Sequence, residues 1–225
     1  MGKSKQRGFA LPTVLGILAL TSLACATVWR MQWVNQQFLN VQFHLVRQQQ
    51  VAEGVFPLVA QDIIGADTTT GAKPESTTNL RHFAGTDAQT HAFYPSTALE
   101  RDKLQLRLGA AICQSGICAP KTLSSLSAAQ WRNVLDQSQP VSVAHLPSNE
   151  VSAFYWVEVW LNTSASEPSV SPFLYRVTVL VQEGASNWAS TPPMAQPNGL
   201  VMQAIWTRAT PTSPVGQWHS WKLLA

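Results

Sequence analysis

Near the start of the chain, residues 9–29 form a long stretch that contains no charged residue. As an α-helix rising about 1.5 Å per residue, this stretch would be about 30 Å long, which matches the hydrocarbon core of a membrane. Lys3, Lys5 and Arg7 precede it, and a single Arg30 follows it. Because the flank richer in basic residues stays in the cytoplasm, the pattern predicts a single-pass membrane helix with all later residues on the outer side.

Composition indicates a folded protein attached to this helix. The chain has 225 residues, of which 45% are hydrophobic and 12% are charged, so a disordered tail is excluded. Apart from Lys3, Lys5 and Arg7, the basic and acidic residues balance each other. We therefore expect no nucleic acid partner, since the remaining chain has no excess of positive charge.

A second helical pattern follows directly after the apolar stretch. Apolar residues recur at steps of three and four through a segment rich in Gln and Asn, which predicts an amphipathic helix continuous with the membrane span to about residue 63. We expect this apolar face to hold the folded part of the chain. Its members are Trp33, Val34, Phe38, Val41, Leu45, Ala52, Val55 and Val59.

The remaining sequence predicts a mixture of one short helix and several strands. Residues 65–100 read as loops with one short strand, and residues 103–108 alternate as a half-buried strand does. A capping box at Ser127 and Gln130 predicts a helix over 128–136. Three segments rich in β-branched and aromatic residues predict an antiparallel sheet of three or four strands packed on the N-terminal helix, an α+β fold. These segments cover residues 154–161, 174–181 and 200–206.

The three cysteines lie in two different settings. Cys25 lies within the apolar stretch, whereas Cys113 and Cys118 lie in the part expected outside the membrane. An oxidising compartment there predicts a small disulfide between Cys113 and Cys118, with free thiols and a metal site as the alternatives. A metal site needs at least two further ligands, and the nearest histidines, His91 and His145, stand alone in loops.

No motif in the sequence indicates catalysis. The chain contains no Gly-x-Ser-x-Gly elbow, no His-Glu-x-x-His pair and no phosphate-binding glycine loop, and its acidic residues are scattered singly. We therefore expect a protein that is not an enzyme, with no catalytic, cofactor-binding or metal-binding residues.

The residues around the start of the apolar stretch resemble a known leader. Gln6-Arg7-Gly8-Phe9-Ala10-Leu11 is similar to the leader of type IV prepilins. The resemblance implies that a prepilin peptidase cuts between Gly8 and Phe9 and that Phe9 is N-methylated. The alternatives are a plain membrane anchor and a lipoprotein signal at Ser22-Leu23-Ala24-Cys25, which would lipidate Cys25.

Two further segments resemble minor pilins of the PilX type. The run RQQQVAEG at residues 47–54 is similar to the RQ-x-AAE segment of that family, and YRVTV at residues 175–179 is similar to one of its head strands. The resemblance implies a pilin-like ladle, in which a long N-terminal α-helix packs on a small antiparallel β-sheet head. It divides the chain into a leader (1–8), a transmembrane and filament-core helix (9–29), an amphipathic second half of the helix (30–63) and a periplasmic head (64–225).

One residue departs from the pattern of major pilins. The fifth residue of the mature chain, a Glu in most pilins, is Thr13. In the family, that Glu is thought to neutralise the terminal amine of an adjacent subunit within the membrane. Its replacement resembles subunits at the filament tip, which implies a role in initiating assembly.

The family also implies partners and a location. The partners would be other minor pilins, the major pilin, prepilin peptidase, the inner-membrane pilus assembly platform and the inner membrane itself. The chain would pass from the bacterial inner membrane, with its head in the periplasm, into the pilus fibre used for twitching motility. The alternatives are a minor pseudopilin of a type II secretion system and a membrane-tethered or lipidated periplasmic binding protein.

Overall fold

The computed structural model describes residues 10–68, 80–83, 90–95, 97–119, 127–141, 151–162, 171–183, 199–210, 213 and 215–224. The chain divides into two compact units, one ending at Val46 and one beginning at Arg47. The first unit is helical. The second combines the end of the same helix with a sheet, so the fold class is α+β, as predicted.

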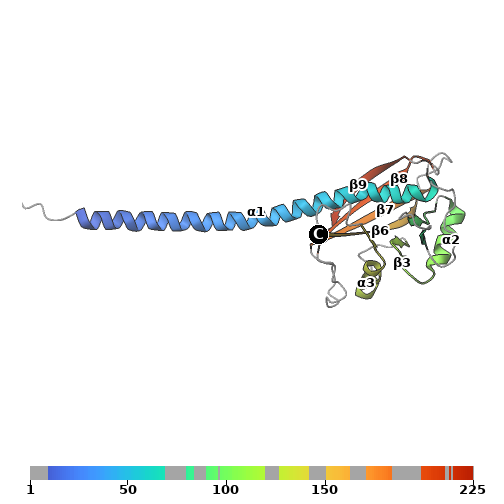
Figure 1. Ribbon diagram of the computed structural model, residues 1–225, viewed down its shortest axis with the longest axis horizontal. Coiled ribbons are helices and arrows are strands. Elements are labelled where there is room, and N and C mark those ends of the chain that lie inside the picture. Colours follow the sequence, from blue (N-terminus) through green and yellow to red (C-terminus); the bar gives the residue numbers. More distant parts are fainter. Residues whose placement is uncertain are drawn as a thin grey trace, which may run out of the picture. The chain divides into compact units, whose positions relative to one another are not determined.

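The helix α1 (Ala10–Thr68) is continuous through both units (Figure 1). The prediction of one uninterrupted helix from the apolar stretch to about residue 63 is therefore confirmed. Within the described residues, α1 is also the helix that is long and apolar enough to cross a membrane, which is consistent with single-pass anchoring.

Four long antiparallel strands form most of the sheet in the second unit. They are β6 (Val151–Leu161), β7 (Phe173–Glu183), β8 (Leu200–Arg208) and β9 (Gly216–Leu224), and they lie side by side in chain order. The first three contain the three predicted strand segments. The fourth, β9, lies at the edge of the sheet. The predicted antiparallel sheet of three or four strands therefore corresponds only to the long strands of the sheet, which has seven strands in the described part of the chain.

Short strands extend the sheet beyond β6 and make it mixed. β3 (Cys113–Gln114) and β4 (Ile117–Cys118) form a hairpin, and β4 runs parallel to β6. β5 (Gln139–Pro140) pairs antiparallel with the same strand. A separate pair, β1 (Arg81–Phe83) and β2 (Thr90–Ala92), lies in the region predicted to hold loops with one short strand, so that prediction missed the second strand.

The end of α1 covers one face of the sheet. Alternate residues of the long strands point toward it, and they form one apolar core with the buried side chains of the helix. The phenyl ring of Phe56 contacts the rings of Trp218 and Trp221 on β9, at centroid distances of 5.1 and 4.6 Å. The helix residues in this core are Val51, Ala52, Val55, Phe56, Val59 and Ile63.

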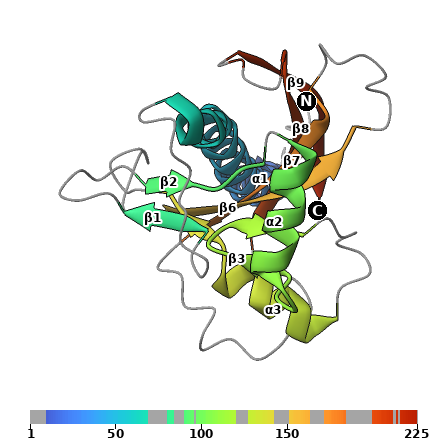
Figure 2. The ribbon, with the colours of Figure 1, turned by 90° about the vertical axis from the view of Figure 1, so that its right-hand side faces the viewer.

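The opposite face of the sheet is covered by α3 (Ala128–Asp136) (Figure 2). Val134 of this helix packs with Trp156 and Leu180 of the sheet, and the ring of Trp131 lies edge-on to Trp156. The second half of α1 and α3 therefore enclose the strands between them, each with its own apolar cluster.

The strand predicted at residues 103–108 is wrong, because this segment belongs to the helix α2 (Ala98–Leu108). Its three leucines alternate in sequence as in a strand, but Leu104 and Leu108 are buried while Leu106 is 82% exposed. Residues four apart share one side of a helix, and the residue midway between them points elsewhere. Burial of Leu104 and Leu108 without Leu106 is therefore what a helix produces from this spacing.

Capping boxes fix the starts of both short helices. In α2, the Thr97 hydroxyl accepts from the Glu100 backbone N–H, and the Glu100 carboxylate accepts from the Thr97 N–H. Ser127 and Gln130 form the same arrangement at α3, which confirms the predicted helix over 128–136. Since each box satisfies two backbone donors, it stabilises the first turn.

The predicted docking face of α1 is only partly correct. Ala52, Val55 and Val59 are buried against the sheet as expected. The earlier members of the same face are exposed, so the buried side chains of α1 begin at Val51. The members that remain exposed are Trp33, Val34, Phe38, Val41 and Leu45.

Candidate functional site

The predicted site residues fall in three places. Gly8 and Phe9, at the predicted leader cleavage site, lie outside the described residues. Thr13 lies on α1 with its side chain exposed, and Cys25, also exposed on α1, is a free cysteine. Cys113 and Cys118 form the predicted disulfide, which joins two residues that face each other in the β3–β4 hairpin.

The first candidate site is the exposed half of α1, which we define as residues 11–46. Every residue in this range is exposed. A large exposed apolar surface is unusual for a soluble monomer and marks contact with a membrane or with other proteins. Its large apolar side chains are Leu11, Val14, Leu15, Ile17, Leu18, Leu20, Leu23, Val28, Trp29, Met31, Trp33, Val34, Phe38, Leu39, Val41, Phe43, Leu45 and Val46.

Three of the four hydroxyl side chains in this half donate hydrogen bonds within the helix itself. Thr21, Ser22 and Thr27 each donate to the backbone carbonyl three residues earlier, at 3.0, 2.9 and 2.8 Å. A polar group that bonds within its own helix needs no water, so it is compatible with a lipid environment. These hydroxyls therefore do not interrupt the apolar surface.

The later part of the exposed half, residues 31–46, has a stripe and no formal charge. Val34, Phe38, Val41 and Leu45 are separated by steps of four, three and four, which places them on one side of the helix. Gln and Asn occupy many positions between them. Such a surface can pack against other helices.

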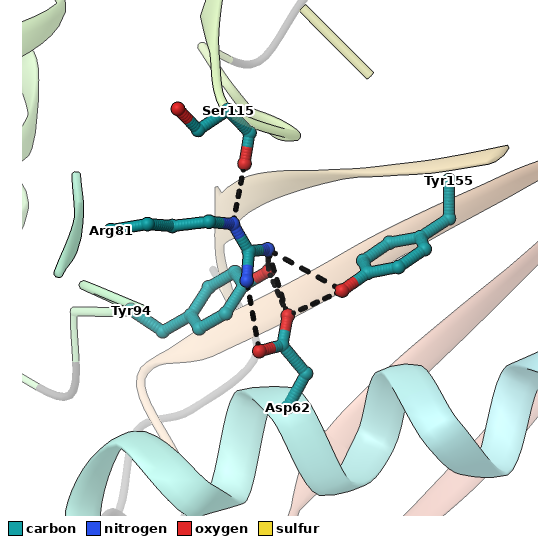
Figure 3. Close-up of polar contacts among 5 residues, drawn as sticks. All are labelled: Asp62, Arg81, Tyr94, Ser115 and Tyr155. Carbon is teal, nitrogen blue, oxygen red and sulfur yellow. Dashed lines mark hydrogen bonds and ion pairs between the residues drawn. The ribbon is translucent and has the colours of Figure 1, made fainter. Parts of the chain in front are cut away.

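The second candidate site is a polar cluster between the other end of α1 and the strands (Figure 3). We define the Asp62 cluster as Asp62, Arg81, Tyr94, Ser115 and Tyr155. Arg81, from β1, donates to both carboxylate oxygens of Asp62 at 3.0 and 2.8 Å. A two-point contact of this kind fixes orientation as well as distance.

The other members of the cluster complete its hydrogen bonding. The hydroxyl of Tyr155, from β6, donates to Asp62 Oδ2 at 2.8 Å, and the hydroxyl of Tyr94 donates to the same oxygen at 3.2 Å. On the far side, Arg81 Nε donates to the backbone carbonyl of Ser115 at 2.6 Å. The cluster thus joins α1, β1, β6 and the β3–β4 turn.

Burial sets the acid–base behaviour of the cluster. It raises the pKa of both the Tyr94 and Tyr155 hydroxyls; the Asp62 carboxylate adds to the rise and Arg81 opposes it. Burial would lower the pKa of the Arg81 guanidinium, but its interactions with Tyr94, Tyr155 and Asp62 outweigh that effect and raise it. Both tyrosines therefore stay neutral, and Arg81 stays charged, throughout the physiological pH range.

A neighbouring contact strengthens the hold on the end of α1. Arg208 of β8 donates from Nη2 to the backbone carbonyl of Ile63 at 2.6 Å, next to Asp62. A hydrogen bond from a charged donor is stronger than one between neutral groups, so this contact holds the helix backbone firmly. The Asp62 cluster and Arg208 together fix how the end of α1 sits on the sheet, which is a positioning role.

Sequence reasoning missed the Asp62 cluster, although the sequence contains one signal for it. Asp62 is an acidic residue beside Ile63 and Ile64, in a segment whose apolar residues are spaced as for burial. A charge at such a position needs a partner. Its partners lie 19 residues or more away in the chain, and only the fold brings them together.

The outer face of the sheet has an ion pair of its own. Arg176 of β7 donates from Nε and Nη2 to the two carboxylate oxygens of Glu158, which is directly opposite on β6. The same guanidinium lies over the Trp160 ring, 4.6 Å from its centroid. These contacts hold β6 and β7 in register, as cross-strand pairs do.

Within the described residues, no three His, Cys, Asp or Glu side chains gather closely enough to hold a metal ion. Comparison with known proteins adds no family: no family model, no curated protein and no solved structure matches the chain. Any functional conclusion therefore depends on the two sites described above and on the sequence motifs.

Proposed function

We propose that this protein is a minor type IV pilin that helps prime pilus assembly as part of a tip or initiation complex. The observation that carries the proposal is that the two parts of α1 have different surroundings. Its exposed half is apolar on a scale that needs lipid or other helices around it, whereas its end is fixed on a sheet by a core and by the Asp62 cluster. A filament subunit needs both properties.

In this function, the exposed half of α1 is surrounded first by the membrane and later by other helices of the filament. Residues 11–29 lie in the inner membrane before assembly, and the head stands in the periplasm. On assembly, the same surface and the stripe over residues 31–46 pack against the helices of other minor pilins and of the major pilin. The absence of formal charge from residues 31–46 supports this proposal, because a buried charge without a partner is costly.

The leader and Thr13 support the more specific parts of the proposal. Prepilin peptidase would cut after Gly8, and Phe9 would become the methylated first residue, as the leader motif implies. With Thr13 in place of Glu, the subunit has no carboxylate there for the terminal amine of a neighbouring subunit. This favours a tip or initiating position, where that contact is not required.

The first test is the intact mass and N-terminal sequence of the protein purified from its native membrane. A chain that begins at methylated Phe9 is the expected result. A chain that begins at lipidated Cys25, or at an uncut Met1, would contradict the proposal and favour a tethered periplasmic protein.

A second test separates assembly from folding. Phe38→Glu places a charge on the exposed stripe and should abolish piliation and twitching motility while leaving the folded head intact. Gln36→Glu adds the same charge on the opposite side of the helix and should retain more function. If deletion of the gene instead blocks exoprotein secretion and spares piliation, the protein is a type II secretion pseudopilin.

A further inference from the structure

The β3–β4 hairpin is too short to hold its shape alone. It has two paired residues on each side, joined by Ser115 and Gly116, and both turn residues have positive φ, at 50° and 79°. This conformation is that of a tight two-residue hairpin turn, and it is unfavourable for a residue with a side chain such as Ser115. Isolated hairpins are marginal even when longer, so the shape of this one depends on what surrounds it.

Two kinds of restraint hold the hairpin. On the β4 side, Gly116 donates its N–H to the Gln137 carbonyl at 2.5 Å, and its carbonyl accepts from Val157 at 2.8 Å. On the β3 side, Ser115 donates its N–H to Gln137 Oε1 at 3.3 Å, and the Ile112 carbonyl accepts from Ala119 at 2.8 Å. The covalent restraint there is the Cys113–Cys118 disulfide, whose two residues are each 2% exposed. The disulfide thus ties β3 to the part of the hairpin that the sheet holds.

The turn between these strands supplies an acceptor to the Asp62 cluster. The carbonyl of Ser115 accepts from Arg81 Nε, whereas Asp62 accepts from the Nη atoms of the same guanidinium (Figure 3). Arg81 is 6% exposed, so a shift of the turn would leave its Nε–H buried without this acceptor. An unsatisfied buried donor is strongly unfavourable.

We propose that the redox state of Cys113 and Cys118 controls how firmly α1 is docked on the sheet. When the disulfide is formed, the turn keeps the Ser115 carbonyl on Arg81, and Arg81 keeps Asp62 in place. When it is reduced, the turn relaxes, Arg81 loses this acceptor and the end of α1 loosens. The coupling runs from the hairpin through Arg81 to Asp62, and it does not depend on the proposed function.

The covalent step is thiol–disulfide exchange with a dithiol partner, and it takes place when local opening of the hairpin exposes the two buried cysteines. On reduction, the Sγ–Sγ bond breaks, two electrons and two protons pass from the dithiol, and Cys113 and Cys118 become thiols while the partner becomes a disulfide. Oxidation by a disulfide-bearing thiol oxidoreductase is the reverse. Firm docking of α1 on the sheet therefore reports that Cys113 and Cys118 have been oxidised.

The experiment compares the full chain with and without the disulfide in detergent micelles. Both forms carry Cys25→Ala, so that Cys113 and Cys118 are the remaining thiols, and the second form also carries Cys113→Ala and Cys118→Ala. Amide hydrogen exchange of residues 51–63 should be about tenfold faster in the second form and should rise more than exchange in β7. Equal exchange of residues 51–63 in the two forms would overturn the proposal.

A second pair of forms separates the coupling from general stabilisation by a disulfide. Arg81→Lys keeps a cation beside Asp62 but removes the Nε donor, so loss of the disulfide should no longer selectively accelerate exchange in residues 51–63. Met202→Ala, on β8 and separated from β4 by β6 and β7, is the matched destabilised control and should retain the full acceleration. If loss of the disulfide accelerates exchange equally in the Arg81→Lys and Met202→Ala variants, the disulfide only stabilises the fold in general, and the coupling through Arg81 is overturned.

If the chain without cysteines does not fold, Gly116→Ala provides the same test with the disulfide intact. A Cβ at this position would lie 2.8 Å from the Gln139 Cβ, and φ is 79°, so the turn must move. Faster exchange of residues 51–63 than of β7 is the expected result. Unchanged exchange of residues 51–63, with the turn displaced, would contradict the proposal.

Discussion

The exposed half of α1 and its docked end are parts of one helix with similar apolar spacing, yet they have opposite environments. In residues 11–46 the large apolar side chains are exposed, whereas between Val51 and Ile63 an apolar stripe is buried against the sheet. Spacing therefore predicts that a helix has an apolar face, but it does not predict what covers that face. The cover depends on the head, whose strands are distant in sequence.

Charge distinguishes the two parts more clearly than hydrophobicity does. Apart from Arg30, residues 11–46 contain no Asp, Glu, Lys or Arg, while the docked end contains the carboxylate of Asp62, which is 13% exposed. That carboxylate is tolerated because the head supplies Arg81 and two tyrosine hydroxyls. An ionised group buried without such a counter-charge would be costly, so a sparsely charged helix surface can be covered by apolar surroundings more easily than the docked end could.

The largest expected effect comes from truncating one phenylalanine in each part. Phe56→Ala should lower the free energy of unfolding by about 4 kcal/mol, because Phe56 is fully buried against Trp218 and Trp221. Phe38→Ala, on the exposed stripe, should change it by less than about 0.5 kcal/mol. Urea unfolding in micelles, followed by tryptophan fluorescence, measures both. Equal losses would show that the stripe also supports the head.

The next effect tests the carboxylates. Asp62→Ala should cost about 3 kcal/mol, since it leaves the buried Arg81 guanidinium without its counter-charge. Glu53 lies nine residues before Asp62 in α1 and is hydrogen-bonded to Gln49 on the exposed side. Glu53→Ala should therefore cost about 0.5 kcal/mol or less. Combining Asp62→Ala with Arg81→Met should cost less than the sum of the two single changes. Additive losses would contradict the pairing.

Local sequence predicted much of the fold where local interactions determine it. The continuous α1, the capping box at Ser127 and the cores of β6, β7 and β8 all followed from spacing and residue type. The Asp62 cluster could not be predicted in this way, because the position of Arg81 beside Asp62 depends on how β1 is placed. The leucines of α2 could not be assigned from spacing alone, because their alternation fits a strand and the four-residue separation of the outer two fits a helix equally well.

Those leucines provide the third prediction. Leu104→Ala should lower the free energy of unfolding by about 2.5 kcal/mol, because Leu104 is buried in the core beneath α2. Leu106→Ala should change it by less than about 0.5 kcal/mol, because that side chain points to solvent. A strand would place both on one face and give similar losses. Thermal unfolding of the two variants distinguishes the helix from the strand.

The smallest effect concerns the tyrosine hydroxyls that allow a carboxylate in the docked end. Tyr155→Phe removes the 2.8 Å hydrogen bond to Asp62 and should cost about 1.5 kcal/mol at neutral pH. Burial raises the pKa of the Tyr155 and Tyr94 hydroxyls above the ordinary value of 10.0. Above that pH the unfolded chain releases these protons while the folded chain keeps them, so stability falls as the pH rises.

The alkaline loss of stability should therefore be smaller in Tyr155→Phe, and smaller again when Tyr94→Phe is added. Urea midpoints measured between neutral pH and about pH 11 give the slope for each variant. Leu106→Ala is the control, since it changes an exposed side chain and leaves all three tyrosines in place, so its alkaline slope should match that of the unchanged protein. If removing both cluster tyrosines leaves the alkaline slope unchanged, these hydroxyls do not keep their protons in the folded state, and the docked carboxylate has a less enclosed setting than the geometry indicates.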